Sequence, residues 1–382
     1  MRVGLVSVWF NRGQATVMRT LRAALDELGH ETYVLARPTD SSFERPGFIA
    51  TDSVWAQDGV THATANTIPP EEYRSWAEET GIECALVFQN LDTVGLAALR
   101  ESGVTVIGTY MWEAFGKTEC AAMRPVVDRF FALNTPTAKW YRRLGLRDVA
   151  EVPYCSSPAL AARARDRDAG DGMRFIYLGG YLRARKAVGP VVEAFVRGAP
   201  ADARLTIKAQ RPVRAGDLII ADDSHQLARR YDLHPGSLAD TGPLDPRIDV
   251  VVGDEDEDDF IELLQQHDVI VGVSRWEGLG LHLFEGEALG LALLLNRMEP
   301  YIDFEAGHEN CFLADSLVIG NRKVGIEVHE PDIDSLARLF AQLGAQPRRR
   351  VGVDHLDAHA ARWREFVDAV ERVVEHKDES RS

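Results

Sequence analysis

The amino-acid sequence predicts an α/β protein with two domains, each built around a mostly parallel β-sheet. Apolar strand-like runs alternate with helix-like segments along the whole chain, which is the pattern of a parallel sheet. The chain has 382 residues, more than one hydrophobic core usually serves. A segment with two prolines and two serines, 151–158, interrupts the alternation and suits a linker. We therefore expect one domain over 1–155 and a second over 156–355.

Local signals place the elements of the first domain. The apolar start runs into polar residues without a cleavage site, so it predicts a first strand and not a signal peptide. A helix from Gly13 should end at Gly29, because glycine commonly follows the last helical turn. Pro69 and Pro70 open another helix. Strands are expected at 3–8, 32–36, 84–88, 104–109 and 129–133, and helices at 13–28, 71–80, 94–102 and 136–144.

The alternation restarts after the linker. The acidic run 254–259 predicts a solvated loop whose last residue caps a helix, with metal binding as the alternative. An amphipathic helix at about 356–374 and a charged tail form a third segment, 356–382. Strands are expected at 173–178, 204–209, 248–252 and 269–273, and helices at 188–197, 223–231 and 259–266.

Charge and composition exclude several classes of partner. The formal net charge of -16 argues against nucleic acid and against docking to anionic lipid. No apolar run reaches the roughly 18 residues that a membrane span needs. The four cysteines are scattered without C-x-x-C spacing, which fits neither structural zinc nor a disulfide framework and suits a reducing cytoplasm.

The first candidate site follows the apolar run 269–273. Glu277 comes next, then a glycine-rich turn and a helix that carries Glu285. Free backbone N–H groups at a helix N-terminus suit phosphate, and ionised carboxylates accept hydrogen bonds from hydroxyls. The pattern therefore favours a ligand with anionic and hydroxyl parts, such as a sugar nucleotide. The alternative is that both glutamates are surface carboxylates around an ordinary turn.

The second candidate site is the segment 179–186, where a strand ends in two glycines and three cations follow: Arg183, Arg185 and Lys186. Fixed cations at this place could neutralise a diphosphate leaving group. The alternative is a solvated basic turn at the sheet edge. In open α/β sheets ligands bind at the carboxyl ends of strands, and both candidate sites lie at such ends.

Together these residues resemble the retaining glycosyltransferases of family four, which have the GT-B fold: two doubly wound Rossmann-like domains facing across a cleft. The segment 277–285 is similar to the E-x7-E signature of that family, and 266–276 to the segment that precedes it. Residues 180–187 match the spacing of the family's G-R-L-x-x-x-K-G phosphate-binding turn, and 309–313 resemble its xNGxLV segment. The resemblance covers the carboxyl-terminal half well and the amino-terminal half loosely.

The resemblance implies a role for each matching residue. Glu285 would bind the ribose hydroxyls of the nucleotide, and Glu277 would contact the donor sugar. Lys186 would act on the diphosphate, with Gly180, Arg183 and Arg185 beside it. The backbone amides of the turn would hold the sugar or phosphate; they belong to Gly278, Leu279, Gly280 and Leu281.

Two departures from the family pattern concern the cationic turn. Tyr181 stands where the family has an arginine, and Ala187 where it has a glycine. Arg183 or Arg185 could supply the missing cation, or the leaving group is less well neutralised.

The first domain should face the acceptor. The family's histidine near the donor sugar is not evident, and the acceptor candidates are Glu113, Trp112 and Asp92. Trp112 could instead be a core residue. Gly13 can bring the first helix close to the ligand, or simply begin that helix. His282 lies within the glycine-rich turn, where ligand contact and plain packing are both open.

We therefore expect a cytoplasmic retaining hexosyltransferase that moves a sugar from a nucleoside-diphosphate sugar to a hydroxyl of a small-molecule or glycan acceptor. Basic side chains and helix N-termini would neutralise the diphosphate, so no cofactor and no metal ion is expected. The resemblance also implies that the last helix packs back on the first domain. The alternatives are a nonhydrolysing sugar-nucleotide epimerase or a phosphorylase of the same fold, or a catalytically silent sugar-nucleotide-binding protein.

Overall fold

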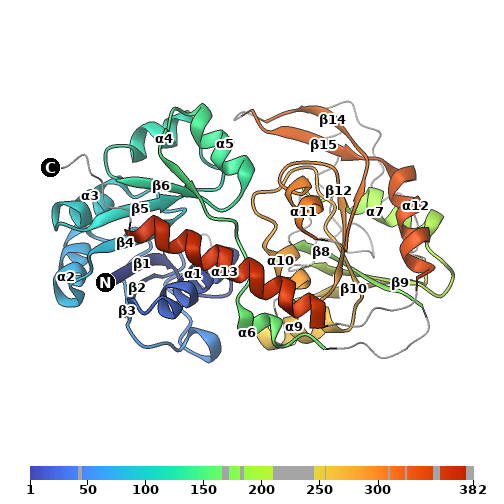
Figure 1. The fold of residues 1–382 in the computed structure, drawn as a ribbon, viewed down its shortest axis with the longest axis horizontal. Coiled ribbons are helices and arrows are strands. Elements are labelled where there is room, and N and C mark those ends of the chain that lie inside the picture. The colour runs from blue at the N-terminus through green and yellow to red at the C-terminus, as the bar shows by residue number, and fades with distance from the viewer. Residues whose placement is uncertain are drawn as a thin grey trace. The chain divides into compact units, whose positions relative to one another are not determined.

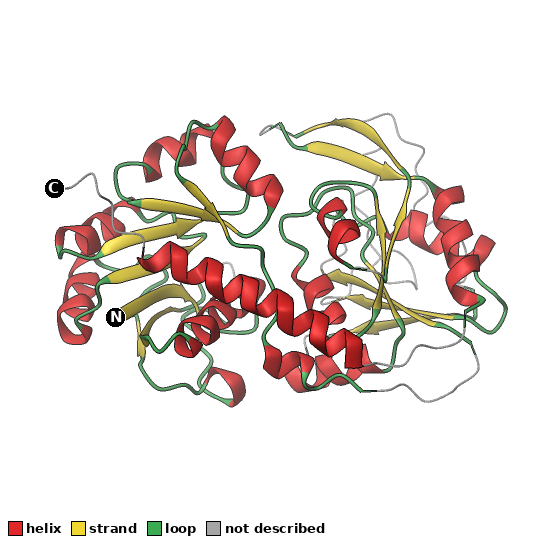
Figure 2. Cartoon of the chain, in the orientation of Figure 1, coloured by secondary structure: helices red, strands yellow, loops and turns green. Residues whose placement is uncertain are grey.

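The computed structural model describes residues 1–41, 45–165, 172–180, 185–209, 245–253, 255–308, 310–322, 325–346 and 353–375. The chain forms two compact units, drawn in Figures 1 and 2. Unit 1 comprises Met1–Ser157 and Ala360–Ser382, and unit 2 comprises Pro158–His359. Among the described residues, no helix combines the length and the apolar character that crossing a membrane requires.

Unit 1 is built on a parallel sheet, which in its described residues has seven strands in the order β3-β2-β1-β4-β5-β6-β7. The chain winds outward from β1 to β3 and then begins again at β4 in the other direction, so β1 and β4 flank a switch point. The strands are β1 (Arg2–Val8), β2 (Glu31–Arg37), β3 (Val60–His62), β4 (Cys84–Phe88), β5 (Thr105–Thr109), β6 (Arg129–Ala132) and β7 (Val149–Glu151). The helices are α1 (Gly13–Glu27), η1 (Ser53–Trp55), α2 (Pro70–Thr80), α3 (Thr93–Glu101), α4 (Lys117–Met123) and α5 (Thr135–Arg143).

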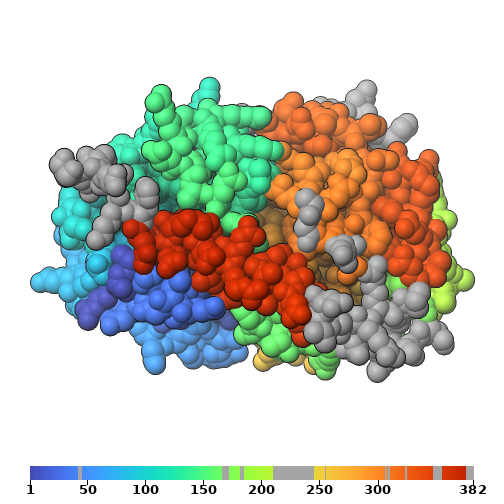
Figure 3. All heavy atoms as spheres, viewed as in Figure 1, coloured from blue at the N-terminus to red at the C-terminus, as the bar shows by residue number. Residues whose placement is uncertain are grey.

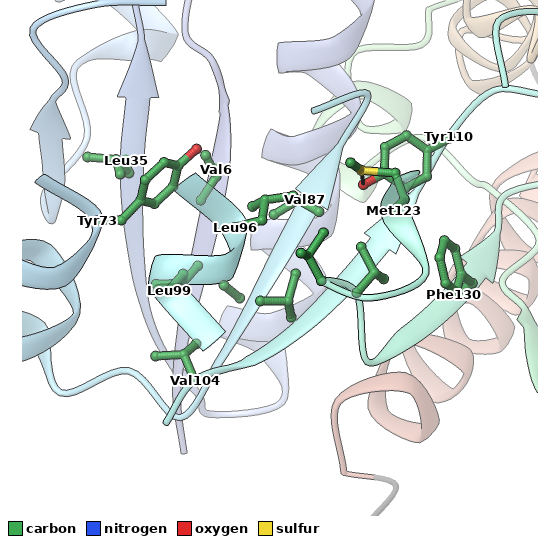
Figure 4. Close-up of a cluster of buried hydrophobic side chains, with 14 of the residues drawn as sticks. Val6, Leu35, Tyr73, Val87, Leu96, Leu99, Val104, Tyr110, Met123 and Phe130 are labelled. Atoms are coloured by element: carbon green, nitrogen blue, oxygen red, sulfur yellow. Dashed lines mark hydrogen bonds between the residues drawn. The ribbon is translucent and has the colours of Figure 1, made fainter. Parts of the chain in front are cut away.

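Side chains on both faces of this sheet are buried. Leu5 and Val6 are neighbours on β1, point to opposite faces and are both 0% exposed. The cluster in Figure 4 lines one face, with Val6 and Val87 on adjacent strands and Leu96 and Leu99 on α3. Helices on both faces of a parallel sheet define the doubly wound architecture, as the alternating pattern predicted.

The carboxyl-terminal part of the chain belongs to unit 1. Helix α13 (Val353–Glu375) continues into this unit from Ala360. Its Trp363 donates a hydrogen bond from Nε1 to Oε2 of Glu27 on α1 over 2.7 Å, and Phe366 packs edge-on against Tyr154. Figure 3 shows α13 on the surface beside the first residues of the chain.

Unit 2 repeats the architecture. Its described residues form a six-stranded parallel sheet in the order β10-β9-β8-β11-β12-β13, which reverses direction between β8 and β11. The strands are β8 (Arg174–Gly180), β9 (Arg204–Ala209), β10 (Ile248–Val252), β11 (Val269–Val271), β12 (Ala292–Asn296) and β13 (Cys311–Ala314). The helices are α6 (Pro158–Ala161), α7 (Val188–Gly198), α9 (Glu257–Gln265), α10 (Leu281–Ala288), α11 (Ile302–Gly307) and α12 (Ile333–Gly344). The helix expected at 223–231 lies outside the described residues.

The alternation of strands and helices did not predict an antiparallel hairpin in unit 2. It consists of β14 (Ser316–Asn321) and β15 (Glu327–Pro331), which follow β13 and extend beside the sheet in Figure 1. A register shift lies between Val318 and Gly320. The irregular register and the exposed Leu317 and Val318 explain why no clear alternating strand pattern was visible in the sequence.

Two small residues fix the helix that follows the first candidate site. A Cβ atom on Gly286 would lie 2.0 Å from Ile270 of β11, and one on Gly272 would lie 2.5 Å from Leu283 of α10. Only glycine therefore allows α10 to pack this closely on β11. The glycines at 272 and 286 set the position of α10 against the sheet.

Candidate active site

The candidate site lies at the switch point of unit 2. β8 ends at Gly180 and β11 at Val271, and these strands are parallel hydrogen-bonded neighbours whose carboxyl ends lie at the same edge of the sheet. Gly180 has φ +53°, a left-handed conformation that glycine adopts without strain. Ligands of doubly wound sheets bind at such a switch point. Both stretches selected from the sequence thus start at the place where this fold builds ligand sites.

Backbone contacts bring the two stretches together. Lys186 and Ser274 form an isolated antiparallel bridge, and the N–H of Arg275 donates to the carbonyl oxygen of Arg185 over 2.7 Å. Arg183 and Tyr181 lie outside the described residues. Ala187 is fully buried in the core of unit 2, beside the cationic pair.

Glu277 joins both described cations of the turn. Nη1 of Arg185 donates to its Oε1 over 2.7 Å, and Nζ of Lys186 donates to its Oε2 over 3.1 Å. The backbone N–H of Gly278 also donates to Oε1. Glu277 is 5% exposed and Lys186 is 6% exposed, so this ion pair is buried, while Arg185 is only partly buried. Charge-assisted hydrogen bonds of this kind hold all three side chains in one arrangement.

The charges in this cluster determine its protonation. Burial alone would raise the pKa of Glu277, but the nearby Lys186 and Arg185 outweigh burial and lower the pKa to about 2. The carboxylate is therefore ionised at neutral pH and carries one negative charge against two positive ones. Two cationic side chains thus lie on this single carboxylate.

The glycine-rich turn ends at the N-terminus of α10. Gly280 is the N-cap and has φ +77°, so the chain enters the helix through a conformation that favours glycine. The N–H groups in the first turn of a helix point toward its N-terminal end, where anions bind. The predicted turn, Gly278–Leu281, therefore lies next to the side chains of Glu277, Lys186 and Arg185, which we call the ion cluster.

The two glutamates of the motif have different surroundings. Glu277 is buried in the ion cluster, whereas Glu285 lies on the second turn of α10 and is partly exposed. Glu287, two residues further along α10, is 8% exposed, and its Oε1 lies 3.6 Å from Nδ1 of His308. A partly exposed carboxylate binds hydroxyl groups of a ligand at lower desolvation cost than a buried one.

The hairpin supports the Glu277 loop from outside the predicted motif. Arg275, 4% exposed, donates from Nε and Nη2 to the two carboxylate oxygens of Glu330 on β15, at 2.6 and 3.1 Å. The N–H of His329 donates to the carbonyl oxygen of Arg275. The guanidinium of Arg322 lies 4.6 Å from the ring centre of Trp276. Sequence reasoning missed these contacts, because nothing in the local pattern at 275 indicates a partner 55 residues away.

A second buried lysine was also missed. Lys208, 5% exposed, lies one residue before the end of β9, next to β8, and its Nζ lies 2.5 Å from Oε2 of Glu255. Its only sequence signal is a lysine within an apolar strand. Glu255 neutralises it locally, so we assign it no ligand.

The contact of Glu255 also corrects the interpretation of the acidic run. The cap of α9 is Asp256, whose side chain accepts from the N–H of Asp259, and not the last residue of the run. The helix begins earlier than predicted because Glu257, Asp258 and Asp259 in its first turn are favoured by the helix dipole. Within the described part of the chain, no group of three His, Cys, Asp or Glu side chains forms a metal site.

His282 lies in the first turn of α10, beside the ion cluster. The residue is partly exposed, but its Nε2 is buried and has no hydrogen-bond partner among the described residues. Burial, with Lys186 and Arg185 adding to it and Glu277 opposing it, lowers the pKa of the imidazole to about 3. At neutral pH His282 is therefore uncharged.

A pH titration of stability checks this state. The folded-state pKa of His282 is below the unfolded value of about 6.5, so on acidification the unfolded chain takes up the proton first. The stabilising contribution of the neutral imidazole is complete above about pH 6.5 and is lost as the pH falls toward 3. Between about pH 6.5 and 5 we expect the wild type to lose on the order of 1 kcal/mol per pH unit more than His282→Gln in urea unfolding. Parallel pH curves for the two proteins would contradict this assignment.

In unit 1 both Gly13 and the acceptor candidates lie at the corresponding edge. Gly13 begins α1 after β1, and Asp92 follows β4, so these two residues flank that unit's switch point. Oδ1 of Asp92 accepts from the N–H of Gly95 as the N-cap of α3. Trp112 and Glu113 follow β5; Trp112 is 6% exposed and Glu113 is partly buried.

The fold and the site can be compared with known proteins. No family model and no curated protein matches the sequence. Among solved structures, the chain is similar to sucrose-phosphate synthase from Thermosynechococcus elongatus, with TM-score 0.62, 16% identity and 98% coverage of both chains. It is similar to the lipopolysaccharide outer core galactosyltransferase WaaB in its apo form, with TM-score 0.59, 10% identity and coverage of 98% and 99%. It is also similar to an E. coli structure described as trehalose-6-phosphate bound with UDP-2-fluoro glucose, with TM-score 0.55, 12% identity and coverage of 98% and 96%.

At such low sequence identities, the similarity to these solved structures establishes the fold of the chain. Two Rossmann-like units with parallel sheets, matching these structures over nearly the whole chain, define the GT-B fold class. The fold class predicted from the sequence is confirmed.

Proposed function

We propose that this protein is a retaining glycosyltransferase, which moves a hexosyl group from a nucleoside-diphosphate sugar to a hydroxyl acceptor. The observation that carries the proposal is the buried cluster of Glu277, Lys186 and Arg185 at the switch point of unit 2, next to the N-terminus of α10. The GT-B fold supports it, since similar structures include a galactosyltransferase and one that is bound with UDP-2-fluoro glucose.

In this proposal the cluster acts on the leaving group. Negative charge develops on the diphosphate as the glycosidic bond breaks, and prearranged cations stabilise that charge. Lys186 and Arg185 provide this stabilisation without a metal ion, together with N–H groups of the turn Gly278–Leu281. The buried position of Lys186 strengthens its effect, because the surroundings screen charge less than water does.

The two glutamates bind different parts of the donor. Glu285, partly exposed on α10, accepts from the ribose hydroxyls, while Glu277 contacts the donor sugar and holds the two cations in place. Unit 1 binds the acceptor in this proposal, with Glu113, Trp112 and Asp92 as the contact candidates. A hydroxyl acceptor that is not a membrane lipid, and a cytoplasmic location, complete the proposal.

Calorimetric titration with UDP, GDP, ADP and dTDP tests the donor site. We expect one of them to bind, and Glu285→Ala to weaken it roughly 10- to 100-fold, the effect of losing charged hydrogen bonds. Glu277→Ala should weaken nucleotide binding less, because its ligand contact is to the sugar. Glu262→Ala, at an exposed position on α9, is the matched control and should leave the affinity unchanged.

Two results would contradict the proposal in different ways. If none of the four nucleotides and no sugar nucleotide binds, the donor site is wrong. If Glu285→Ala and Glu277→Ala have equal, negligible effects, the roles of the two glutamates are wrong. Turnover assays separate the alternatives: conversion of the donor without an acceptor indicates an epimerase, use of free phosphate a phosphorylase, and binding without turnover a silent binding protein.

A further inference from the structure

His282 has a buried nitrogen without a partner in a place surrounded by charge. It lies in the first turn of α10, one residue after the helix begins, and its Nε2 is buried and unpaired among the described residues. A buried polar atom that makes no hydrogen bond destabilises the folded protein, because it has lost its hydration without a replacement. Its neighbours Leu281 and Leu283 are apolar, so an apolar residue at 282 would avoid this cost. Within the described part of the chain this nitrogen has no partner, and a hydrogen bond to a ligand would remove the cost.

The surroundings define the chemistry of that partner. The charged groups that act on the imidazole are Lys186 and Arg185 from the turn after β8, and Glu277 from the loop after β11. The ion cluster holds two cations and one carboxylate, and the N-terminus of α10 adds its partial positive charge. This combination attracts an anionic oxygen. An uncharged imidazole with its proton on Nε2 donates a hydrogen bond to such an oxygen.

We propose that His282 is a further ligand-contacting residue, whose uncharged imidazole donates a hydrogen bond from Nε2 to a phosphate oxygen of the donor's diphosphate. The proposal rests on the proposed function and adds a contact to it. It adds a neutral side-chain donor to the phosphate site, next to the cations Lys186 and Arg185 and the N–H groups of the turn. The ligand oxygen would then satisfy the buried nitrogen.

The test compares two substitutions that differ in one donor. Glutamine places an amide N–H near the position of Nε2, whereas phenylalanine fills the space without a donor. We expect His282→Phe to weaken the binding of the preferred nucleoside diphosphate roughly 10- to 100-fold, and His282→Gln to recover most of that loss. The loss of affinity in His282→Phe should be the same for the nucleoside diphosphate and for the corresponding nucleotide sugar. His62→Phe, at an exposed position in unit 1, is the control and should bind as the wild type does.

The pH dependence of nucleotide affinity tests the protonation state of His282. Because a neutral imidazole donates in this proposal, the affinity ratio of wild type to His282→Gln should stay constant between about pH 8 and 5.5. A ratio that rises through about pH 6.5 on acidification would indicate an imidazolium and overturn the neutral donor. Circular dichroism verifies that each variant is folded, and His282→Leu replaces the phenylalanine variant if that variant does not fold.

Pyrophosphate as a second ligand separates this inference from the proposed function. Suppose that pyrophosphate binds, that no nucleotide does, and that His282→Phe weakens the binding of pyrophosphate. The contact between His282 and an anion then stands, while the assignment of a nucleotide sugar as the ligand fails. If His282→Phe binds nucleotide and pyrophosphate as tightly as the wild type, the contact is overturned. A loss confined to the nucleotide sugar would place the contact on the sugar and overturn the phosphate assignment. A wild type that binds neither ligand overturns both proposals.

Discussion

Replacing Glu277 by glutamine is expected to lower the free energy of unfolding by about 3–5 kcal/mol, the cost of removing one partner of a buried ion pair. Lys186 is 6% exposed and Arg185 only partly buried, and both donate to this carboxylate. A neutral amide cannot compensate the buried ammonium group, which then loses hydration without gaining a counter-ion. Urea unfolding of the wild type and the variant measures the difference.

Two further variants show whether the loss comes from the buried charge. Glu193→Gln removes the exposed partner of Arg197 on α7 and should change stability by less than about 1 kcal/mol. The double variant Lys186→Met/Glu277→Leu removes both charges of the buried pair and should recover part of the stability that Glu277→Gln loses. If Glu277→Gln is no more harmful than Glu193→Gln, the ion cluster does not hold the loop together as described.

The second large effect concerns turnover. Lys186→Met is expected to lower the rate of sugar transfer roughly 100- to 1,000-fold, which is typical of losing one group that stabilises charge in a transition state. Arg185 remains and keeps part of the attraction for the ground-state diphosphate, so the affinity for the nucleotide should fall less than the turnover. Steady-state kinetics with the preferred sugar nucleotide, and calorimetry with its nucleoside diphosphate, give the two numbers.

Lys208 offers a matched control for this prediction. It is another buried lysine of unit 2, one residue before the end of β9, and it pairs with Glu255 and not with a member of the ion cluster. Lys208→Met should therefore reduce stability while the folded protein keeps its rate of transfer. Equal losses of turnover in Lys186→Met and Lys208→Met would show that the effect is structural, and the role of Lys186 in the reaction would have to be abandoned.

Local patterns predicted the part of the site that is local in the chain. The segment from Val269 to Glu285 contains a strand, a glycine-rich turn and a helix, and each was visible because its signal lies within a few residues. The cationic pair Arg185 and Lys186 was visible for the same reason. The hairpin of β14 and β15 was not, since its register is irregular and two of its apolar residues are exposed.

Contacts between distant segments could not be read from these patterns. Glu277 and Lys186 are 91 residues apart, and Arg275 and Glu330 are 55 apart. A charged residue on its own does not show whether it is solvated or paired, because that depends on which strands become neighbours. His282 is a further example, since the sequence left ligand contact and packing equally open. Its buried, unpaired Nε2 became visible only with the helix in place.

The sequence alone determined that two doubly wound parallel sheets would form, and that a glycine-rich turn between Glu277 and Glu285 would follow a central strand. These features depend on periodicity, turn residues and helix signals, which act over one or two turns of chain. Only the tertiary structure decided that β8 and β11 are neighbours at a switch point, and that Glu277 is buried between two cations while Glu285 is partly exposed. The reason is physical: burial and charge pairing are properties of surroundings that folding assembles from distant segments.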